Sequence, residues 1–190
     1  MASSSPRRRE LLDSIGLKFK VIESNFEENS LKEKYNPYDL AKVLAFNKAK
    51  DVYLRYDCGI VLGADTVVIL GDKVYGKPKD EDDARVMLRD LSGRAHDVVT
   101  GVSLIGRKGQ IVTESEITKV IFKDLDKDDI DAYIKTRDYV GKAGAYGIQG
   151  KGAVLVKKIE GSYSNVVGLP IEILCGMFEK IGDSIYARWQ

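Results

Sequence analysis

The chain has 190 residues, and its 44% hydrophobic and 31% charged residues are the balance of a folded globular protein, which argues against a disordered chain and a membrane protein. Its 30 basic and 29 acidic side chains leave a net charge of +1, so no overall positive field is expected to attract nucleic acid or an anionic membrane. We expect a single domain over residues 1–190.

The sequence shows neither a membrane-spanning segment nor a secretory signal peptide. The longest apolar stretch, near 166–178, is interrupted by Pro170 and Glu172, and it is shorter than the ~20 residues that a membrane helix needs. Serines and arginines follow the first residue, without the apolar core of a signal peptide. Cys58 and Cys175 lack metal or redox spacing and predict reduced thiols, so the expected location is cytoplasmic.

The first part of the chain predicts helices with clear start signals. Ser5 can cap a helix over 6–15, and a strand over 19–22 follows. Asn36-Pro37 opens a second helix that runs to about residue 53. The nearly continuous apolar run over 60–70 predicts a buried strand that turns back at Gly71-Asp72.

The rest of the chain predicts further helices and strands in alternation. Expected in order are a helix between Asp80 and Ser92-Gly93, a hairpin of 98–105 and 110–122, a short helix from Asp126, a glycine-rich connection over 141–152, a strand over 153–159 and a helix over 170–181. Strands that alternate with helices, with one hairpin, predict an α/β fold around a mixed sheet.

The segment Ser3–Arg9 departs from the usual electrostatics of a helix start. A helix N-terminus carries partial positive charge and prefers acidic residues in its first turn, whereas this one has three arginines. Backbone N–H groups, serine hydroxyls and guanidinium groups together can bind phosphate. The alternative is a solvated basic helix start whose arginines pair with Glu10 or Asp13. We favour phosphate.

Asp65 is a carboxylate in the middle of the apolar run over 60–70. Burying an ionised carboxylate is costly unless a cation, hydrogen bonds or a proton compensate it. A metal ligand or a catalytic group is therefore predicted. The alternative is an aspartate at a sheet edge that caps a neighbouring loop.

Two lysines occur in contexts that suit anion binding. Lys48 lies on helical spacing with Ala41 and Ala45, so its stem is expected to run along a small-residue face, and its amine either reaches an anion or extends to solvent. Lys77 follows a turn in Gly76-Lys77-Pro78, where a plain surface lysine is equally compatible.

The segment 142–150 is rich in small residues, which allow a backbone to approach a ligand closely, although it matches no phosphate-loop motif. Its Gln149 has the donor and acceptor needed to recognise a base edge. His96 is the only histidine and no nucleophile is marked for it, so a structural role is favoured.

Six segments in consistent order resemble the Maf family of nucleoside triphosphate pyrophosphatases: SSSPRRRELL, GADTVV, GKP, LSGRAHDVVTGV, KAGAYGIQGKGA and IEGSYSNVVGLP. The resemblance implies a twisted mixed β-sheet flanked by helices, in two lobes with a central cleft, related to the inosine triphosphate pyrophosphatase fold. It also implies a homodimer and the Mg²⁺- or Mn²⁺-dependent hydrolysis of a nucleoside triphosphate to monophosphate and pyrophosphate.

The resemblance also assigns roles by motif. Arg7, Thr66 and Gln149 resemble the branch that acts on dTTP and UTP. Asp65 would be the proton acceptor or a metal ligand, with Glu28 as the second carboxylate. The phosphates would be bound by Ser3, Ser5, Arg8, Lys48, Lys77 and Lys142. The alternative function is a nucleotide-binding regulator of cell division that does not turn its ligand over.

Two departures from the family pattern are visible. The chain begins almost at the serine loop, without the short apolar strand that usually precedes it, which leaves the strand's support of that loop open. Arg137-Asp138 stands where many members have a Gly-Glu pair, which leaves the role of Asp138 open.

Overall fold

The computed structural model describes residues 1–27, 31, 35–56 and 59–189, which form two compact units. Unit 1 consists of Met1–Asp65, Thr100–Glu116 and Gly168–Gln190, and unit 2 of Thr66–Val99 and Ile117–Val167. The two units agree with the two lobes expected from the resemblance. The single domain over residues 1–190 and a cleft between lobes stay predictions.

The described strands form a five-stranded sheet in the order β2-β1-β3-β4-β5. Their bounds are Val61–Leu70 for β1, Lys73–Tyr75 for β2, Ala95–Ile105 for β3, Ile111–Phe122 for β4 and Val156–Glu160 for β5. β2 pairs with β1 in antiparallel fashion, with Val68 opposite Tyr75, after a turn at Gly71 whose φ is 60°. β5 pairs with β4 in antiparallel fashion, with Lys119 opposite Glu160. Both edge strands are therefore antiparallel to their neighbours.

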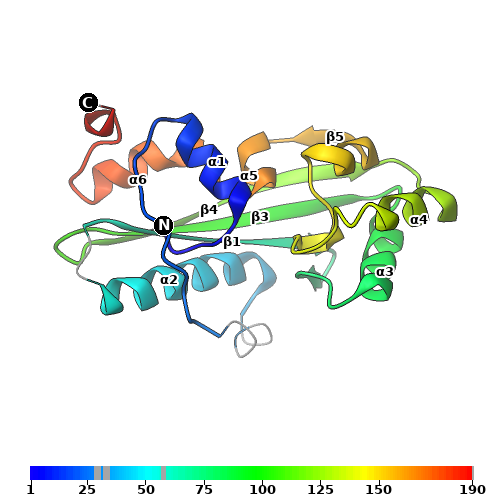
Figure 1. Cartoon of the computed structure of the whole chain (residues 1–190), viewed down its shortest axis with the longest axis horizontal. Helices are drawn as coiled ribbons and strands as arrows, with labels where there is room; N and C mark the ends of the chain where they lie inside the picture. The colour runs from blue at the N-terminus through cyan, green and yellow to red at the C-terminus, as the bar shows by residue number, and fades with distance from the viewer. Residues whose placement is uncertain (28–30, 32–34, 57–58, 190) are drawn as a thin grey trace. The chain divides into compact units, whose positions relative to one another are not determined.

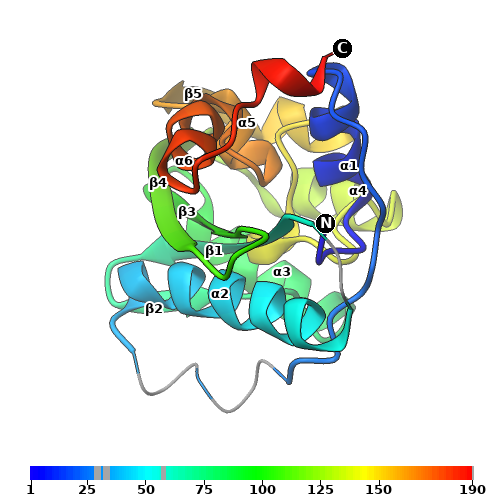
Figure 2. The same ribbon diagram turned by 90° about the vertical axis from the view of Figure 1, so that its left-hand side faces the viewer.

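Unit 1 places helices on both faces of its part of the sheet. Helix α2 (Pro37–Arg55) covers one face, and α1 (Pro6–Ser14) and α6 (Leu174–Lys180) cover the other (Figures 1 and 2). The side chains of β1 alternate accordingly: Leu62 packs in a core with Leu12 and Phe178, whereas Val61 packs with Ala49 and Val52 of α2. The predicted α/β class, a sheet flanked by helices, is confirmed.

Helix α2 lies unusually close to the strands because both surfaces are made of small residues. Ala41, Ala45 and Ala49 are fully buried at 0% exposure, as their four-residue spacing on one helix face predicts. A Cβ atom at Gly63 of β1 would lie 2.3 Å from the Ala45 carbonyl oxygen. At Gly101 of β3 it would lie 2.3 Å from that of Ala41. Glycine at these two strand positions therefore sets the separation between α2 and the sheet.

Unit 2 contains α3 (Glu81–Leu91), α4 (Lys127–Lys135) and α5 (Tyr163–Val167), and α3 packs against α4 (Figure 1). The predicted caps are confirmed: the Asp80 carboxylate accepts from the Asp83 backbone N–H, and Asp126 and Asp129 form a capping box. Short 3₁₀ turns cover Ala143–Ala145 and Gly150–Leu155. The core of unit 2 is apolar and includes Val68, Leu88, Val120, Ile134 and Leu155.

Several predicted elements are wrong or shifted. Residues 19–22 are not a strand, because their backbone bonds to the N-terminus instead: the Met1 amine donates to the Lys20 carbonyl at 2.7 Å and the Ile22 N–H donates to the Met1 carbonyl at 3.0 Å. The strand expected over 153–159 begins later, after the 3₁₀ turn. The last helix is divided into a 3₁₀ turn over Ile171–Ile173 and α6, and α5 was not predicted.

The backbone that precedes the serine loop is bonded to β1. Met1 and Ala2 are buried, and the Ala2 N–H donates to the Leu62 carbonyl of β1 at 2.7 Å. The support of this loop, which the sequence left open, includes this hydrogen bond to β1.

Two smaller sequence expectations concern the membrane and the thiols. In the described part of the chain, every helix is too short or too polar to cross a bilayer. Cys175 is a free thiol, and Cys58 lies outside the described residues.

Candidate functional site

The serine loop of unit 1 is organised by Ser3. Ser5 occupies the N-cap position of α1, but its side chain makes no capping bond to the described helix. The Ser3 hydroxyl instead accepts from the Ser5 backbone N–H at 3.3 Å and from the Arg8 guanidinium at 3.0 Å. The hydrogen-bonded cap predicted for Ser5 is therefore wrong, and Ser3 and Arg8 are brought together.

Arg8 is buried, in contrast to the exposed Arg9. The residue is 9% exposed, and its Nε donates to the Gly168 carbonyl at 2.6 Å. The guanidinium thus ties the start of α1 to the segment that precedes α6, 160 residues away. Arg7, at the preceding position of the same helix start, is half-buried. No acidic residue lies in the first turn of α1, so the predicted preference for an anion there is retained.

Asp65 and Lys48 form a pair in unit 1. The Lys48 amine lies 2.5 Å from an Asp65 carboxylate oxygen, and both side chains are 12% exposed. Odd-numbered residues of β1 face α2, as Gly63 does, so Asp65 points towards the helix that carries Lys48. The register places Lys73–Tyr75 of β2 opposite Val68–Leu70, so β2 does not reach Asp65 and the alternative of a sheet-edge aspartate stays open. The cation that a buried carboxylate requires is supplied by Lys48.

Lys142 of unit 2 is held by Asp138. Its amine donates to the Asp138 carboxylate at 2.7 Å and also to the Asp138 carbonyl, and its side chain is 11% exposed. The same carboxylate accepts from the Gly152 N–H at 3.3 Å, so Asp138 contacts both ends of the segment 142–152. Asp138, whose role the sequence left open, is therefore a partner of Lys142.

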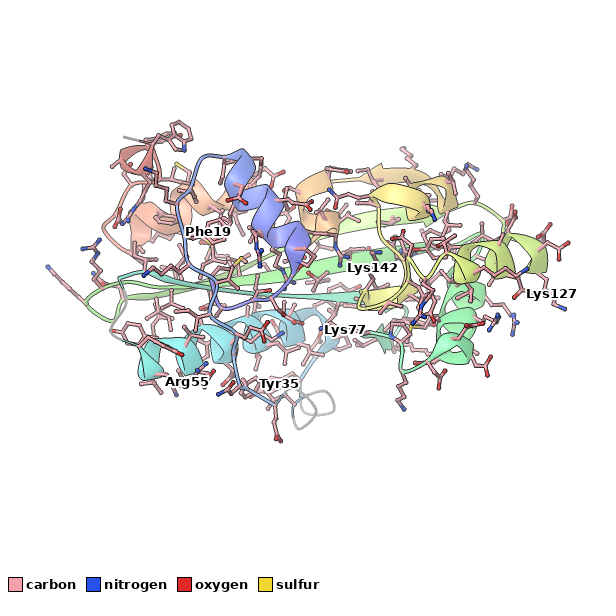
Figure 3. All side chains as sticks on the ribbon, viewed as in Figure 1. Phe19, Tyr35, Arg55, Lys77, Lys127 and Lys142 are labelled. Carbon is pink, nitrogen blue, oxygen red and sulfur yellow. The ribbon has the colours of Figure 1, made fainter. Side chains whose placement is uncertain are left out.

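Lys77 lies on a loop adjacent to this segment. The Gly144 N–H donates to the Gly76 carbonyl at 3.1 Å, which joins the two loops that carry Lys142 and Lys77. Figure 3 labels both lysines, one on each loop. Lys77 is exposed, whereas Gln149 and Thr66 are half-buried.

His96 is buried in unit 2 beside Tyr146. Its Nε2 lies 2.7 Å from the Tyr146 hydroxyl, and burial lowers the pKa of His96 from 6.5 to about 4. Burial also raises the pKa of Tyr146 far above its ordinary value, so both groups are neutral near pH 7. This burial agrees with the structural role predicted for His96.

The metal prediction rests on one described carboxylate. Glu28 lies outside the described residues, and those that are described contain no cluster of three acidic, histidine or cysteine side chains suited to an ion. Mg²⁺ is commonly bound by one or two carboxylates together with substrate phosphates and water. Asp65 fits a metal that arrives with a polyphosphate, and does not fit an ion enclosed by protein ligands alone.

Comparison with known proteins agrees with this chemistry. The fold and these side chains define a class: an α/β protein with cationic groups suited to phosphate and a buried, lysine-bonded carboxylate. The chain belongs to the Maf family, since the family model described as Maf-like protein matches residues 1–181.

Two relatives from bacteria are named dTTP/UTP pyrophosphatase. The protein of Ruminiclostridium cellulolyticum is 46% identical over 186 residues, which cover 97% of this chain and 96% of that protein. That of Thermoanaerobacter sp. (strain X514) is 50% identical over 185 residues, which cover 96% of each. A solved structure from Mycobacterium abscessus, titled nucleoside-triphosphatase / dITP/XTP pyrophosphatase, is 16% identical with a TM-score of 0.39, over 64% of this chain and 70% of that chain.

Proposed function

We propose that the chain hydrolyses dTTP and UTP to the nucleoside monophosphate and pyrophosphate. The proposal is supported by family membership and by relatives at 46% and 50% identity that are named for this activity. The observation that carries it is the Lys48–Asp65 pair, a buried carboxylate whose charge is balanced by a lysine at 2.5 Å. A protein that needed stability alone would gain little from such a pair, because an apolar pair of similar volume is often as stable.

In this proposal Asp65 accepts a proton from the attacking water. The water oxygen bonds to the α phosphorus, the bond from that phosphorus to the bridging oxygen breaks, and pyrophosphate leaves with the bridging oxygen. Lys48 orients the carboxylate through its 2.5 Å contact. Positive side chains near the phosphates counter the negative charge that develops on the leaving group.

The phosphate-binding and base-recognising roles follow the family assignment. Ser3, Ser5 and Arg8 would contact phosphate from the start of α1. Because Arg8 is already bonded to the Gly168 carbonyl, we assign it the additional role of orienting this loop. Lys77 and Lys142 would also contact phosphate, and Arg7, Thr66 and Gln149 would select the pyrimidine base.

We further propose that Mg²⁺ or Mn²⁺ is required, bound by Asp65 with Glu28 as a second carboxylate. Such an ion would neutralise part of the triphosphate charge. From the family resemblance we also propose that the protein is a homodimer, which light scattering of the purified protein tests. We propose a cytoplasmic location on the same basis, which cell fractionation tests.

The direct experiment is a product assay with purified protein, Mg²⁺ or Mn²⁺, and either dTTP or UTP. We expect pyrophosphate and no orthophosphate, and loss of the activity in Asp65→Asn. Asp72→Asn is the matched control, since Asp72 is exposed in the turn between β1 and β2. Orthophosphate alone, or full activity in Asp65→Asn, would contradict the proposal. Tight nucleotide binding without any product over hours would favour the regulatory alternative.

A further inference from the structure

The glycine-rich segment 142–149 contains a strained turn in its middle. Gly144 has a φ of 66° and Ala145, directly after it, has a φ of 60°. A left-handed conformation costs a residue with a side chain about 1–2 kcal/mol, so surrounding contacts must hold Ala145 in place. Ala145 is itself 0% exposed, which removes the option of relaxing into solvent.

The residue after this turn is anchored in the core. Tyr146 is 5% exposed, and its hydroxyl lies 2.7 Å from Nε2 of His96, which is 2% exposed. Both rings also pack edge-on against Phe122, with centroid distances of 4.6 Å for Tyr146 and 5.0 Å for His96. A polar bond within an apolar, perpendicular ring cluster fixes the direction of the tyrosine as well as its burial.

The anchor lies between two residues to which substrate contacts are assigned. Lys142 precedes Tyr146 by four positions and Gln149 follows it by three. The 3.1 Å bond from the Gly144 N–H to the Gly76 carbonyl holds the turn from one side, and the ring cluster holds it from the other. Loss of either contact would allow Ala145 to leave its strained conformation.

We propose that His96 and Tyr146 are positioning residues that, through their mutual hydrogen bond, hold the segment 142–149 in the conformation in which Lys142 and Gln149 contact the nucleotide. The role extends the proposed function and rests on it. Neither side chain takes part in the reaction itself, and the rival explanation is that the pair only fills the core.

The test uses Tyr146→Phe, His96→Phe and the double variant, with Tyr139→Phe as the matched control. Tyr139 is buried in the same apolar core, at 8% exposure, and precedes the segment. We expect faster amide hydrogen exchange at residues 143–148 in Tyr146→Phe, measured without nucleotide, and unchanged exchange there in Tyr139→Phe. We expect the KM for dTTP to rise about tenfold and kcat to change less, because a lost hydrogen bond to a buried partner is typically worth this factor.

The double variant separates positioning from packing. With both polar groups removed, no buried partner is left unpaired, so resistance to urea is expected to return towards that of the unmodified protein. Under our proposal the KM stays raised and exchange at 143–148 stays fast. Recovery of KM and exchange together with stability would overturn it, as would unchanged exchange in Tyr146→Phe. If the unmodified protein releases no pyrophosphate, the proposed function fails, while the exchange data still decide whether the pair holds the segment.

Discussion

Replacing Gly101 by alanine tests the close contact between α2 and the sheet. The added Cβ would lie 2.3 Å from the carbonyl carbon and oxygen of Ala41 and 2.5 Å from the Lys42 nitrogen. Ordinary carbon–oxygen contacts are about 3.3 Å or longer. Because all three atoms belong to the backbone of α2, no side chain can move aside, and the helix itself must shift by roughly 1 Å. Such overpacking costs about 3 kcal/mol, and the loss of chain entropy in the unfolded state returns about 1 kcal/mol. The expected net destabilisation is about 2 kcal/mol.

The same substitution at Gly176 is expected to have the opposite sign. Gly176 lies in α6, and a Cβ there would meet no described atom within 4 Å, so alanine should stabilise the helix by about 1 kcal/mol. Urea unfolding of both variants measures the two free energies. A pyrophosphate assay should show a loss of up to about 100-fold for Gly101→Ala, because the shift of α2 displaces Lys48 from Asp65. Equal stability and activity of Gly101→Ala and the unmodified protein would refute the argument.

Three further predictions concern charges and caps. Lys48→Met leaves the Asp65 carboxylate buried without its partner at 2.5 Å, so the free energy of unfolding in urea should fall by about 3 kcal/mol and pyrophosphate release should be lost. Lys50 is exposed, so Lys50→Met should keep both the stability and the activity. Folding lowers the pKa of His96 from 6.5 to about 4. Between these two pH values the unfolded chain therefore binds more protons than the folded protein. The free energy of unfolding should fall by about 3 kcal/mol as the pH falls from 6.5 to about 4. In His96→Gln the free energy of unfolding should no longer depend on pH between about 6 and 5, and a dependence that persists in this variant would contradict the assignment to His96. Carboxylates with lowered pKa values, such as Asp51 and Asp90, change stability only below their unfolded pKa of 3.8 and do not interfere in this range. Asp126→Ala removes the capping box of α4 and should cost about 1 kcal/mol in thermal unfolding without changing activity; an unchanged midpoint would mean that the cap contributes nothing.

Helix starts were predictable because their signals are local. Asn36, Asp80 and Asp126 each accept a backbone N–H two or three residues ahead, and these bonds require no knowledge of the rest of the fold. The segment 19–22 was mistaken for a strand because its apolar content does not reveal its partner. That partner is the N-terminal residue, and not a strand of the sheet.

The candidate site could be predicted as separate residues and not as pairs. Asp65 and Lys48 were each recognised from their surroundings, but their contact depends on which face of β1 meets α2. The contact of Arg8 with Gly168 joins residues that are 160 positions apart, and that of His96 with Tyr146 joins residues 50 apart. No spacing rule in the sequence connects such distant residues. The Lys142–Asp138 pair, at four-residue spacing, is a contact that the sequence could have indicated.

The placement of Gly63, Asp65 and Thr66 on β1 determines where the chain tolerates changes in length. Consecutive residues of a strand face opposite sides, so deleting one residue from 61–64 would direct Thr66 towards Lys48 and Asp65 away from it. The adjacent turn is different: at Gly71 a Cβ would meet no described atom within 4 Å, and the chain there is exposed. Insertions and deletions should therefore be excluded from the first half of β1 and accepted at its far end, a few residues away.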